Sequence, residues 1–465
     1  MTALLSGSAF AVERFPPPDF DPGYKMPVPT MPAPRAIYLE YLDVAVLLAA
    51  LSLSVYLVLR KRSRSWILGL MLFSLAYFGF WRKGCVCAIG SIQDVMLALF
   101  DNGYAVPLTV VAFFLLPLVF TLFFGRTFCA AVCPIGAIQD VMLVRPIKVR
   151  PWLEHALGIV PFFYLGAAVL FAATGSGFII CQYDPFVSFF RRSGSVNMLA
   201  IGAGFLLVGL IVGRPYCRFL CPYGALLRVV SRFSKWNVTL TPEDCIKCQL
   251  CDVACPFGAI REPGPALPEG KPAAPSGTGI EEGNAGPSIK KQASAKAMIG
   301  WGVLTVLLMV SCGWLGARSS GFLSYENRTV ALAERVAAEA AGKAFVSADT
   351  VVPSTVRLSA SEQREENLRL ASQAFRQTGQ PVDELYAAAR VARNRFKVGG
   401  WLLGAFVGLV IGIKLISLSI LPDRTIYEPD RANCVACGRC YTHCPREQVR
   451  VKRMQRGKTN PAIPA

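Results

Sequence analysis

The segments CIKCQLCDVACP (residues 245–256) and CVACGRCYTHCP (residues 434–445) carry the same cysteine pattern twice. Three cysteines two residues apart, followed three residues later by Cys-Pro, are spaced as the ligands of a [4Fe–4S] cluster. Three such thiolates close around one cubane, and in two-cluster proteins the cysteine beside the proline ligates the other cluster. The pattern therefore predicts two cross-ligated clusters, one held by Cys245, Cys248, Cys251 and Cys444 and the other by Cys434, Cys437, Cys440 and Cys255.

Other cofactors are less compatible with the sequence. A zinc knuckle and structural disulfides are the alternatives for these eight cysteines, but the complete spacing occurs twice and ends in Cys-Pro both times, which favours clusters. The chain has only two histidines, His155 and His443, so no haem is expected. No Gly-x-Gly-x-x-Gly follows a strand-like run, so no Rossmann nucleotide site is expected.

The hydropathy of the chain predicts an integral membrane protein. Its 465 residues are 53% hydrophobic, and the mean hydropathy is +0.44. Apolar runs long enough to cross a hydrocarbon core of about 30 Å are expected at residues 38–59, 66–81, 106–124, 153–174, 196–212, 298–317 and 398–421. The expected fold is mainly α: a polytopic transmembrane helical bundle of about seven spans with a split cytoplasmic α+β 2[4Fe–4S] ferredoxin module.

The basic loops predict the orientation in the membrane. Residues 60–64, 126–150 and 214–235 are rich in Lys and Arg and are therefore expected in the cytoplasm of a bacterium, with the N-terminus outside the inner membrane. Two spans separate the cysteine runs, so both runs and the C-terminus are expected on the cytoplasmic side. The formal charge of +18 then points to anionic lipid headgroups as partners, and no nucleic acid is expected.

These features divide the chain into eight segments. We expect an extracytoplasmic N-terminal segment (1–36), a transmembrane core (37–235), a first ferredoxin half (236–262), a flexible linker (263–297), a transmembrane helix (298–317), a periplasmic helical insert (318–397), a second transmembrane helix (398–421) and a second ferredoxin half (422–465).

An internal repeat lies in the membrane core. CAIGSIQDVML (87–97) and CPIGAIQDVML (133–143) agree at nine of eleven positions, and a fainter copy begins at Cys221. One span separates the first two copies, which predicts an inverted-topology repeat. The alternative is a favourable helix start used twice. Asp94 and Asp140 end the Gln-Asp pairs that the two copies share. Proton transfer, quinone binding and simple helix-surface polarity are all open as roles for these two aspartates.

A second set of cysteines follows the membrane spans. Cys129 and Cys133 in one Cys-x3-Cys-Pro motif, and Cys217 and Cys221 in another, are expected at the same cytoplasmic boundary, where four thiolates could hold iron or a third iron–sulfur cluster. Buried structural cysteines are the alternative. On the outer side, Cys85, Cys87 and Cys181 are candidates for an outer or mid-membrane site, a disulfide or spare thiols.

The motifs together resemble the membrane polyferredoxin family that includes the NosR and NapH proteins of nitrous oxide and periplasmic nitrate respiration. The resemblance covers residues 84–262 and 433–447. It implies that the two Cys-x3-Cys-Pro motifs and the eight ferredoxin cysteines carry over as family motifs, and that electrons pass between the quinone pool or a cytoplasmic donor and a periplasmic acceptor. The chain departs from NosR in lacking a large N-terminal flavin-binding domain, in carrying Cys85-x-Cys87, and in splitting its ferredoxin halves.

The expected function is thus that of an electron-transfer subunit of an oxidoreductase complex. Its expected partners are membrane lipids, quinone and other redox subunits, among them a flavin- or haem-carrying periplasmic protein. A maturation factor that reduces a metal for a respiratory metalloenzyme is an alternative from another class. A redox sensor is the third candidate function.

Overall fold

A computed structural model describes residues 35–84, 88–101, 103–191, 196–240, 245–263, 295–342, 360–419 and 426–459. Most of the expected N-terminal segment and linker, together with Cys85 and Cys87, lies outside these residues. The chain forms two compact units. One comprises Arg35–Gly316 and Trp401–Ala465, and the described part of the other is Ala317–Gly400.

The first unit is built from apolar helices, which fit a membrane protein. Five helices in the described residues are long and apolar enough to span a membrane: Ile37–Lys61 (α1 and η1), Arg64–Trp81 (α2 and η2), Pro151–Ala173 (α6 and α7), Met298–Arg318 in α14, and Val382–Ser419 (α18). The expected spans at 106–124 and 196–212 correspond to shorter apolar helices, α4 (Leu108–Phe124) and α10 (Val196–Gly209).

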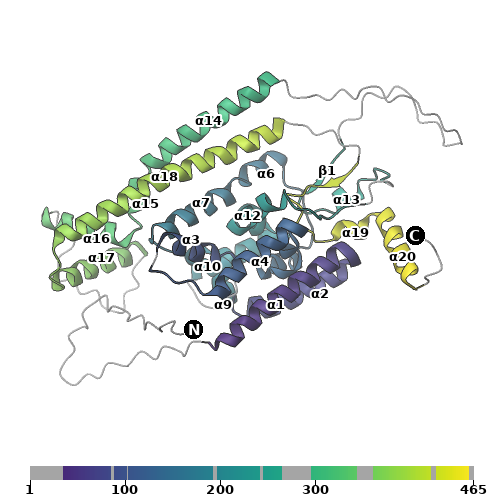
Figure 1. Cartoon of the computed structure of the whole chain (residues 1–465), viewed down its shortest axis with the longest axis horizontal. Coiled ribbons are helices and arrows are strands. Elements are labelled where there is room, and N and C mark those ends of the chain that lie inside the picture. Colours follow the sequence, from purple (N-terminus) through teal and green to yellow (C-terminus); the bar gives the residue numbers. More distant parts are fainter. Residues whose placement is uncertain are drawn as a thin grey trace, which may run out of the picture. The chain divides into compact units, whose positions relative to one another are not determined.

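Short helices lie between these longer ones in the sequence, and some of them are labelled in Figure 1. These short helices are α3 (Ser91–Phe100), η3 (Phe128–Val132), α5 (Pro134–Val141), α8 (Ile179–Tyr183), α9 (Pro185–Arg191), α11 (Pro215–Phe219) and α12 (Pro222–Ser231). Pro134 and Pro222 occupy the first position of α5 and α12, where a proline costs no hydrogen bond. Each Cys-Pro pair is therefore a helix start, with Cys133 or Cys221 in the capping position.

The two cysteine runs lie side by side although two long helices separate them in the sequence. The first run contains α13 (Leu250–Val253) and leads to β1 (Ile260–Arg261); β2 (Glu428–Pro429) leads into the second run, with α19 (Arg439–His443) and α20 (Pro445–Thr459). β1 pairs antiparallel with β2, and the Asp430 N–H donates to the Ala259 carbonyl at 2.7 Å.

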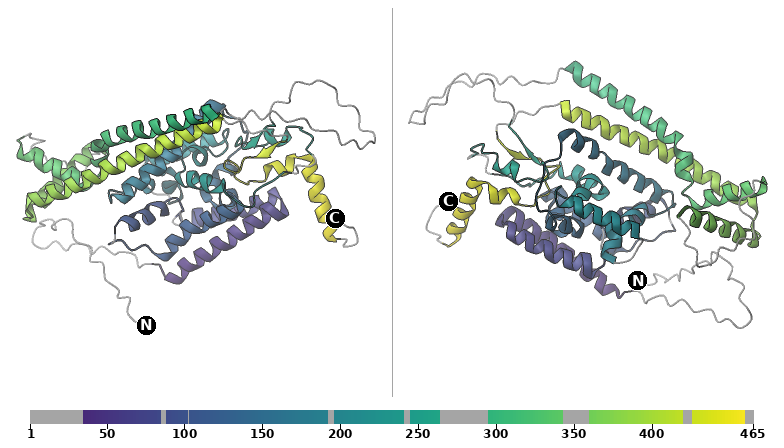
Figure 2. Two further views of the ribbon diagram at one scale, coloured as in Figure 1. Left: turned by 45° about the horizontal axis from the view of Figure 1, so that its top comes forward. Right: turned by 180° about the vertical axis from the view of Figure 1, so that it is seen from behind.

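The intervening helices α14 (Ala295–Arg318) and α18 (Val382–Ser419) approach each other through glycines of α18. Figure 2 shows α14 beside the C-terminal part of α18 in both views. A Cβ on Gly404 would lie 1.9 Å from the Cys312 carbonyl oxygen, and one on Gly408 would lie 2.4 Å from that of Leu308. Spacing of small residues by four lets membrane helices pack backbone to backbone.

The second unit is a small helical assembly. It contains α15 (Ser320–Ser324), α16 (Arg328–Ala340), α17 (Ala360–Gln377) and the N-terminal part of α18. Asn327 caps α16 by accepting from the Thr329 N–H at 3.1 Å. The buried apolar core of this second unit consists of Val330, Ala333, Val336, Leu385 and Ala389.

Candidate metal centres

The two cysteine runs fold into loops with the same backbone shape. Lys247 and Gln249 flank the second cysteine of the first run with φ of 53° and 63°, and Ala436 and Gly438 flank that of the second run with φ of 55° and 73°. Left-handed backbone is uncommon outside glycine. Where it alternates with right-handed residues, successive N–H groups turn to one side and form a nest for an anion, as at many iron–sulfur sites. Both loops are thus shaped for an anionic group.

The thiols expected to hold the first cluster come together. Cys251 interacts electrostatically with Cys444 of the other run and, more weakly, with Cys245 and Cys248 of its own. Burial is the main cause that raises the pKa of Cys251 to about 11.

The thiols expected to hold the second cluster also come together. Cys434 interacts with Cys437 and with Cys255 of the first run, and Cys440 interacts with all three. All four line one cavity, along with the backbone of the nest. The Ala259 N–H donates to the Cys255 sulfur at 3.4 Å. The structure therefore places the last cysteine of each run with the three leading cysteines of the other run.

The four cysteines of the Cys-x3-Cys-Pro motifs form a third group, the membrane thiol site. Cys221 interacts with Cys217, Cys133 and Cys129. Burial is the first cause that raises the pKa of Cys217 to about 12. The sulfurs are nevertheless provided with donors: the Gly224 N–H donates to Cys221 at 3.2 Å and the Gln139 amide donates to Cys217 at 3.3 Å.

Buried arginines lie beside these thiols, and their positive charge favours an anionic cluster at the site. Arg126 donates to the Cys129 sulfur at 3.8 Å, and Arg214, 1% exposed, lies within electrostatic range of Cys217 and Cys129. Arg214 is paired through its Nε with Asp140 at 3.6 Å, whereas the Nε of Arg126 has no hydrogen-bond partner among the described residues. Buried cations need anionic partners, and thiolates around an iron–sulfur core would supply one for Arg126.

A single metal ion fits less well. Among the described residues, no three His, Cys, Asp or Glu side chains lie close enough together to hold one metal ion. A cubane is several atoms across and holds its thiolates further apart than one ion does. The donor sets therefore suit iron–sulfur clusters better than zinc.

The repeat places two glutamines in equivalent roles that the sequence alone did not reveal. The Gln93 carbonyl accepts from the Ile180 N–H at 3.0 Å, and the Gln139 carbonyl accepts from the Tyr216 N–H at 3.0 Å. Ile180 directly precedes Cys181 as Tyr216 precedes Cys217. The sequence signal for this role is the recurrence of glutamine at the same position of both repeat copies. Cys181 is exposed in the middle of α8, and its expected partners Cys85 and Cys87 lie outside the described residues.

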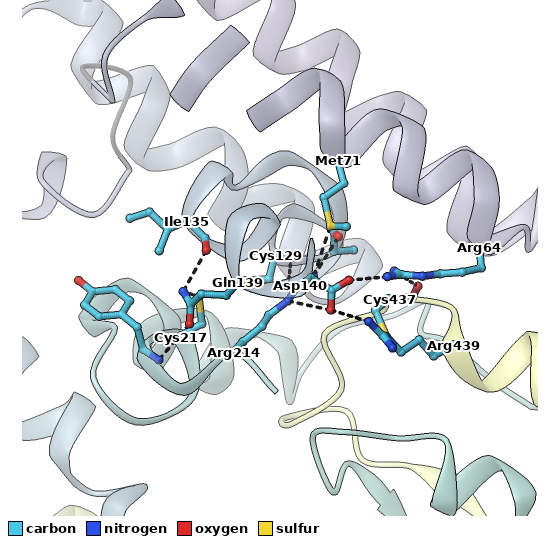
Figure 3. Close-up of polar contacts among 12 residues, drawn as sticks. Arg64, Met71, Cys129, Ile135, Gln139, Asp140, Arg214, Cys217, Cys437 and Arg439 are labelled. Atoms are coloured by element: carbon cyan, nitrogen blue, oxygen red, sulfur yellow. Dashed lines mark hydrogen bonds and ion pairs between the residues drawn. The ribbon is translucent and has the colours of Figure 1, made fainter. Parts of the chain in front are cut away.

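Asp140 lies between the membrane thiol site and the second cysteine run (Figure 3). The carboxylate is buried and forms ion pairs with Arg64, with Arg214 at 3.6 Å and with Arg439 at 3.4 Å. Burial acts to raise the pKa of Asp140, but the three guanidinium groups more than offset it and lower that pKa to about 2. The aspartate is therefore ionised at physiological pH. In the first repeat copy, Asp94 instead accepts from the Tyr104 hydroxyl at 3.0 Å.

Comparison with known proteins agrees with this geometry. Residues 106–154 and 195–241 match one 4Fe–4S binding domain family, and residues 238–261 match another. The first match contains all four cysteines of the membrane thiol site, and the second contains the first cysteine run. The relatives include YccM of Escherichia coli K12, whose name proposes a role in electron transport, and NirI of Paracoccus denitrificans. These matches are consistent with a membrane polyferredoxin family.

The extent of these matches varies. The chain is 31% identical to YccM over 23% of its own length and 32% of YccM, and 29% identical to NirI over 25% of its length and 18% of NirI. The uncharacterized protein MJ0750 of Methanocaldococcus jannaschii is 29% identical over 39% of this chain and 77% of that protein. The chain thus spans about a third of YccM and less than a fifth of NirI. No solved structure matches.

Proposed function

We propose that this polyferredoxin is a membrane-bound electron-transfer subunit that relays electrons between the cytoplasmic side or the quinone pool and a periplasmic acceptor within a larger redox complex. The observation that carries the proposal is the gathering of twelve cysteines into three groups of four within one compact unit. Two groups hold the ferredoxin clusters in the cross-ligated arrangement, and the membrane thiol site holds a third iron–sulfur centre. Bound clusters supply one-electron redox couples.

The protein's own residues bind and tune these centres. The nests around Lys247–Gln249 and Ala436–Gly438, and the N–H groups of Ala259 and Gly224, offer hydrogen bonds to sulfur. Hydrogen bonds to the sulfurs and burial are the factors that set cluster potential. The two ferredoxin halves act as one module because β1 and β2 pair.

The order of the groups supports a relay. Cys440 of the second group interacts with Cys251 of the first, which makes the two ferredoxin groups neighbours. Arg126 donates to the Cys129 sulfur and also lies within electrostatic range of Cys434, so it links the second group to the membrane thiol site. The two ferredoxin groups would therefore hold neighbouring clusters, and the membrane thiol site would hold a third redox centre next to the second of them.

The orientation proposed for the relay rests on the sequence. The basic loops favour a cytoplasmic ferredoxin module. Because the outer surface is about 30 Å away, a further centre is needed on the outer side; Cys85, Cys87 and Cys181 are its proposed location. The periplasmic partner would carry a flavin or haem, and quinone and membrane lipids would complete the assembly.

Iron and sulfide analysis with an EPR redox titration tests the proposal. We expect more iron than the roughly eight atoms of two cubanes. Cys133→Ala should lower the iron content and leave both ferredoxin signals, while Cys312→Ala, outside the three groups, should leave the iron unchanged. About eight iron atoms in wild type and variant alike would reject the membrane centre. Absence of iron–sulfur signals from the purified protein would reject the whole proposal.

A further inference from the structure

We propose that Asp140 and its three arginine partners form a charged hub that positions the membrane thiol site against the second cluster and raises the reduction potential of that cluster. The inference rests on the proposed function, because it requires the Cys434 group to hold a cluster. These four residues are positioning and tuning residues; none of them ligates metal.

Two of the arginines bind Asp140 and also the backbone of a cysteine group. Arg64 forms an ion pair with Asp140 and donates to the Cys437 carbonyl at 2.9 Å. Arg214 pairs with the same carboxylate and donates to the carbonyls of Cys129 and, at 3.4 Å, Ala130. One buried carboxylate therefore connects the carbonyl of a membrane-site cysteine to that of a second-cluster cysteine.

The hub carries excess positive charge. Three guanidinium groups face one carboxylate, and their side chains are 15%, 2% and 24% exposed for Arg64, Arg214 and Arg439. Charges interact more strongly away from water than in it. A cluster gains negative charge when it is reduced, so buried positive charge beside it favours the reduced state. Arg214 lies within electrostatic range of Cys437, and the hub should therefore raise the potential of the second cluster.

The first cluster has a different electrostatic setting. Within its run, Asp252 forms an ion pair with Lys148, so one negative charge meets one positive charge there. The contacts of the hub arginines with cysteine carbonyls go to Cys437 and Cys129. Loss of a hub charge should thus change the potential of the second cluster more than that of the first.

The repeat supplies a matched control. Asp94 occupies the position of Asp140 in the first copy, but no ion pair found among the described residues involves it. The arginine partners are therefore specific to the second copy and are not a property of the shared Gln-Asp helix start.

The test is an EPR-monitored redox titration of the full-length protein. Asp140→Asn removes a negative charge and should raise the potential of the second cluster. Arg214→Gln removes a positive charge and should lower it. Arg64→Gln should also lower it, whereas Arg64→Lys keeps the charge and should stay near wild type. Asp94→Asn should leave both ferredoxin potentials unchanged.

Shifts of the reduction potential in opposite directions distinguish electrostatic tuning from structural damage to the cluster site. If Asp140→Asn and Arg214→Gln shifted the potential in the same direction, or shifted the first cluster as much as the second, the hub would be refuted. If Arg214→Gln did not assemble, Arg439→Gln, at a more exposed position, would provide the same test of sign. A wild-type protein without cluster signals would instead refute the proposed function itself.

Discussion

The thiol of Cys444, in the second run, lies within electrostatic range of Cys251 in the first run, as do Cys245 and Cys248 of the first run itself. The relationship is reciprocal, because Cys255 of the first run interacts with Cys437 of the second. The last cysteine of each run thus lies near leading cysteines of the other run, as the predicted cross-ligation requires. The pairing of β1 with β2 aligns the runs despite the long insertion between them.

Exchange of the last cysteines can be tested by mutation. Cys255→Ala should abolish or alter the signal of the cluster held by Cys434, Cys437 and Cys440, because it removes the fourth ligand of that cluster. Cys444→Ala should affect the other cluster. EPR spectra of the two variants, with Cys312→Ala as the control thiol, provide the measurement. Loss of the cluster in the same run as the mutated cysteine would show that each run is self-contained.

Gln139 should support the membrane thiol site specifically. Gln139→Leu removes the acceptor of the buried Tyr216 N–H and the amide donor to Cys217. An unsatisfied buried group costs about 1–3 kcal/mol, so we expect a lower unfolding temperature and less iron at this site.

Gln93→Leu is the matched variant in the other copy of the repeat. It should cost similar stability through the Ile180 N–H but leave the iron of the membrane thiol site in place. Equal iron loss in both variants would argue against a specific role for Gln139. Iron content and apparent unfolding temperature in detergent give the two readouts.

The sequence could propose the cysteine groups because ligand spacing is a local property, and their assignment to clusters stays a prediction. The membrane character and the helix starts at Cys133-Pro134 and Cys221-Pro222 were likewise visible in short segments. Contacts between distant segments were not. Asp140 was interpreted as a possible proton carrier, quinone ligand or surface residue, since nothing near it in the chain indicates that Arg64 and Arg439 converge on it.

Two finer features could not be read from the sequence. The helices α4 and α10 occur where spans are expected at 106–124 and 196–212 but are two and three residues shorter, because hydropathy measures apolar length and does not locate where a helix begins or ends. The spacing of Gly404, Gly408 and Gly412 was present in the sequence, but only the structure shows that α14 packs there.

Asp184 should make stability depend on pH. It is 2% exposed, accepts from the Tyr216 hydroxyl at 2.9 Å and from the Phe186 N–H, and burial raises its pKa from 3.8 to about 6. A carboxyl whose folded pKa is raised contributes stability below its unfolded pKa and loses it as pH rises towards the folded value. The loss therefore occurs between about pH 4 and pH 6.

The comparison with Asp184→Asn isolates this effect. The amide of the variant remains neutral, so its stability should match that of wild type near pH 4. At pH 7 the variant should be the more stable protein. The difference should be at most about 3 kcal/mol, at 1.4 kcal/mol per pKa unit. Asp140→Asn should show no such trend between pH 5 and 8, since the pKa of Asp140 is about 2. A pH-independent difference between wild type and Asp184→Asn would contradict the raised pKa.

The close packing of α14 on α18 should require glycine, with a hydrogen atom as its side chain, at the contact positions of α18. Gly408→Ala would place a methyl group 2.4 Å from the Leu308 carbonyl oxygen and 2.8 Å from the Met309 Cα. Backbone atoms cannot move aside cheaply, so the helices must separate at a cost of about 1–3 kcal/mol. Gly300→Ala on α14 meets nothing within 4 Å and should be neutral or slightly stabilising, because alanine favours a helix over glycine by about 1 kcal/mol. Apparent unfolding temperatures in detergent should therefore fall for Gly408→Ala alone, and equal temperatures for the two variants would mean that the glycines do not set the distance between α14 and α18.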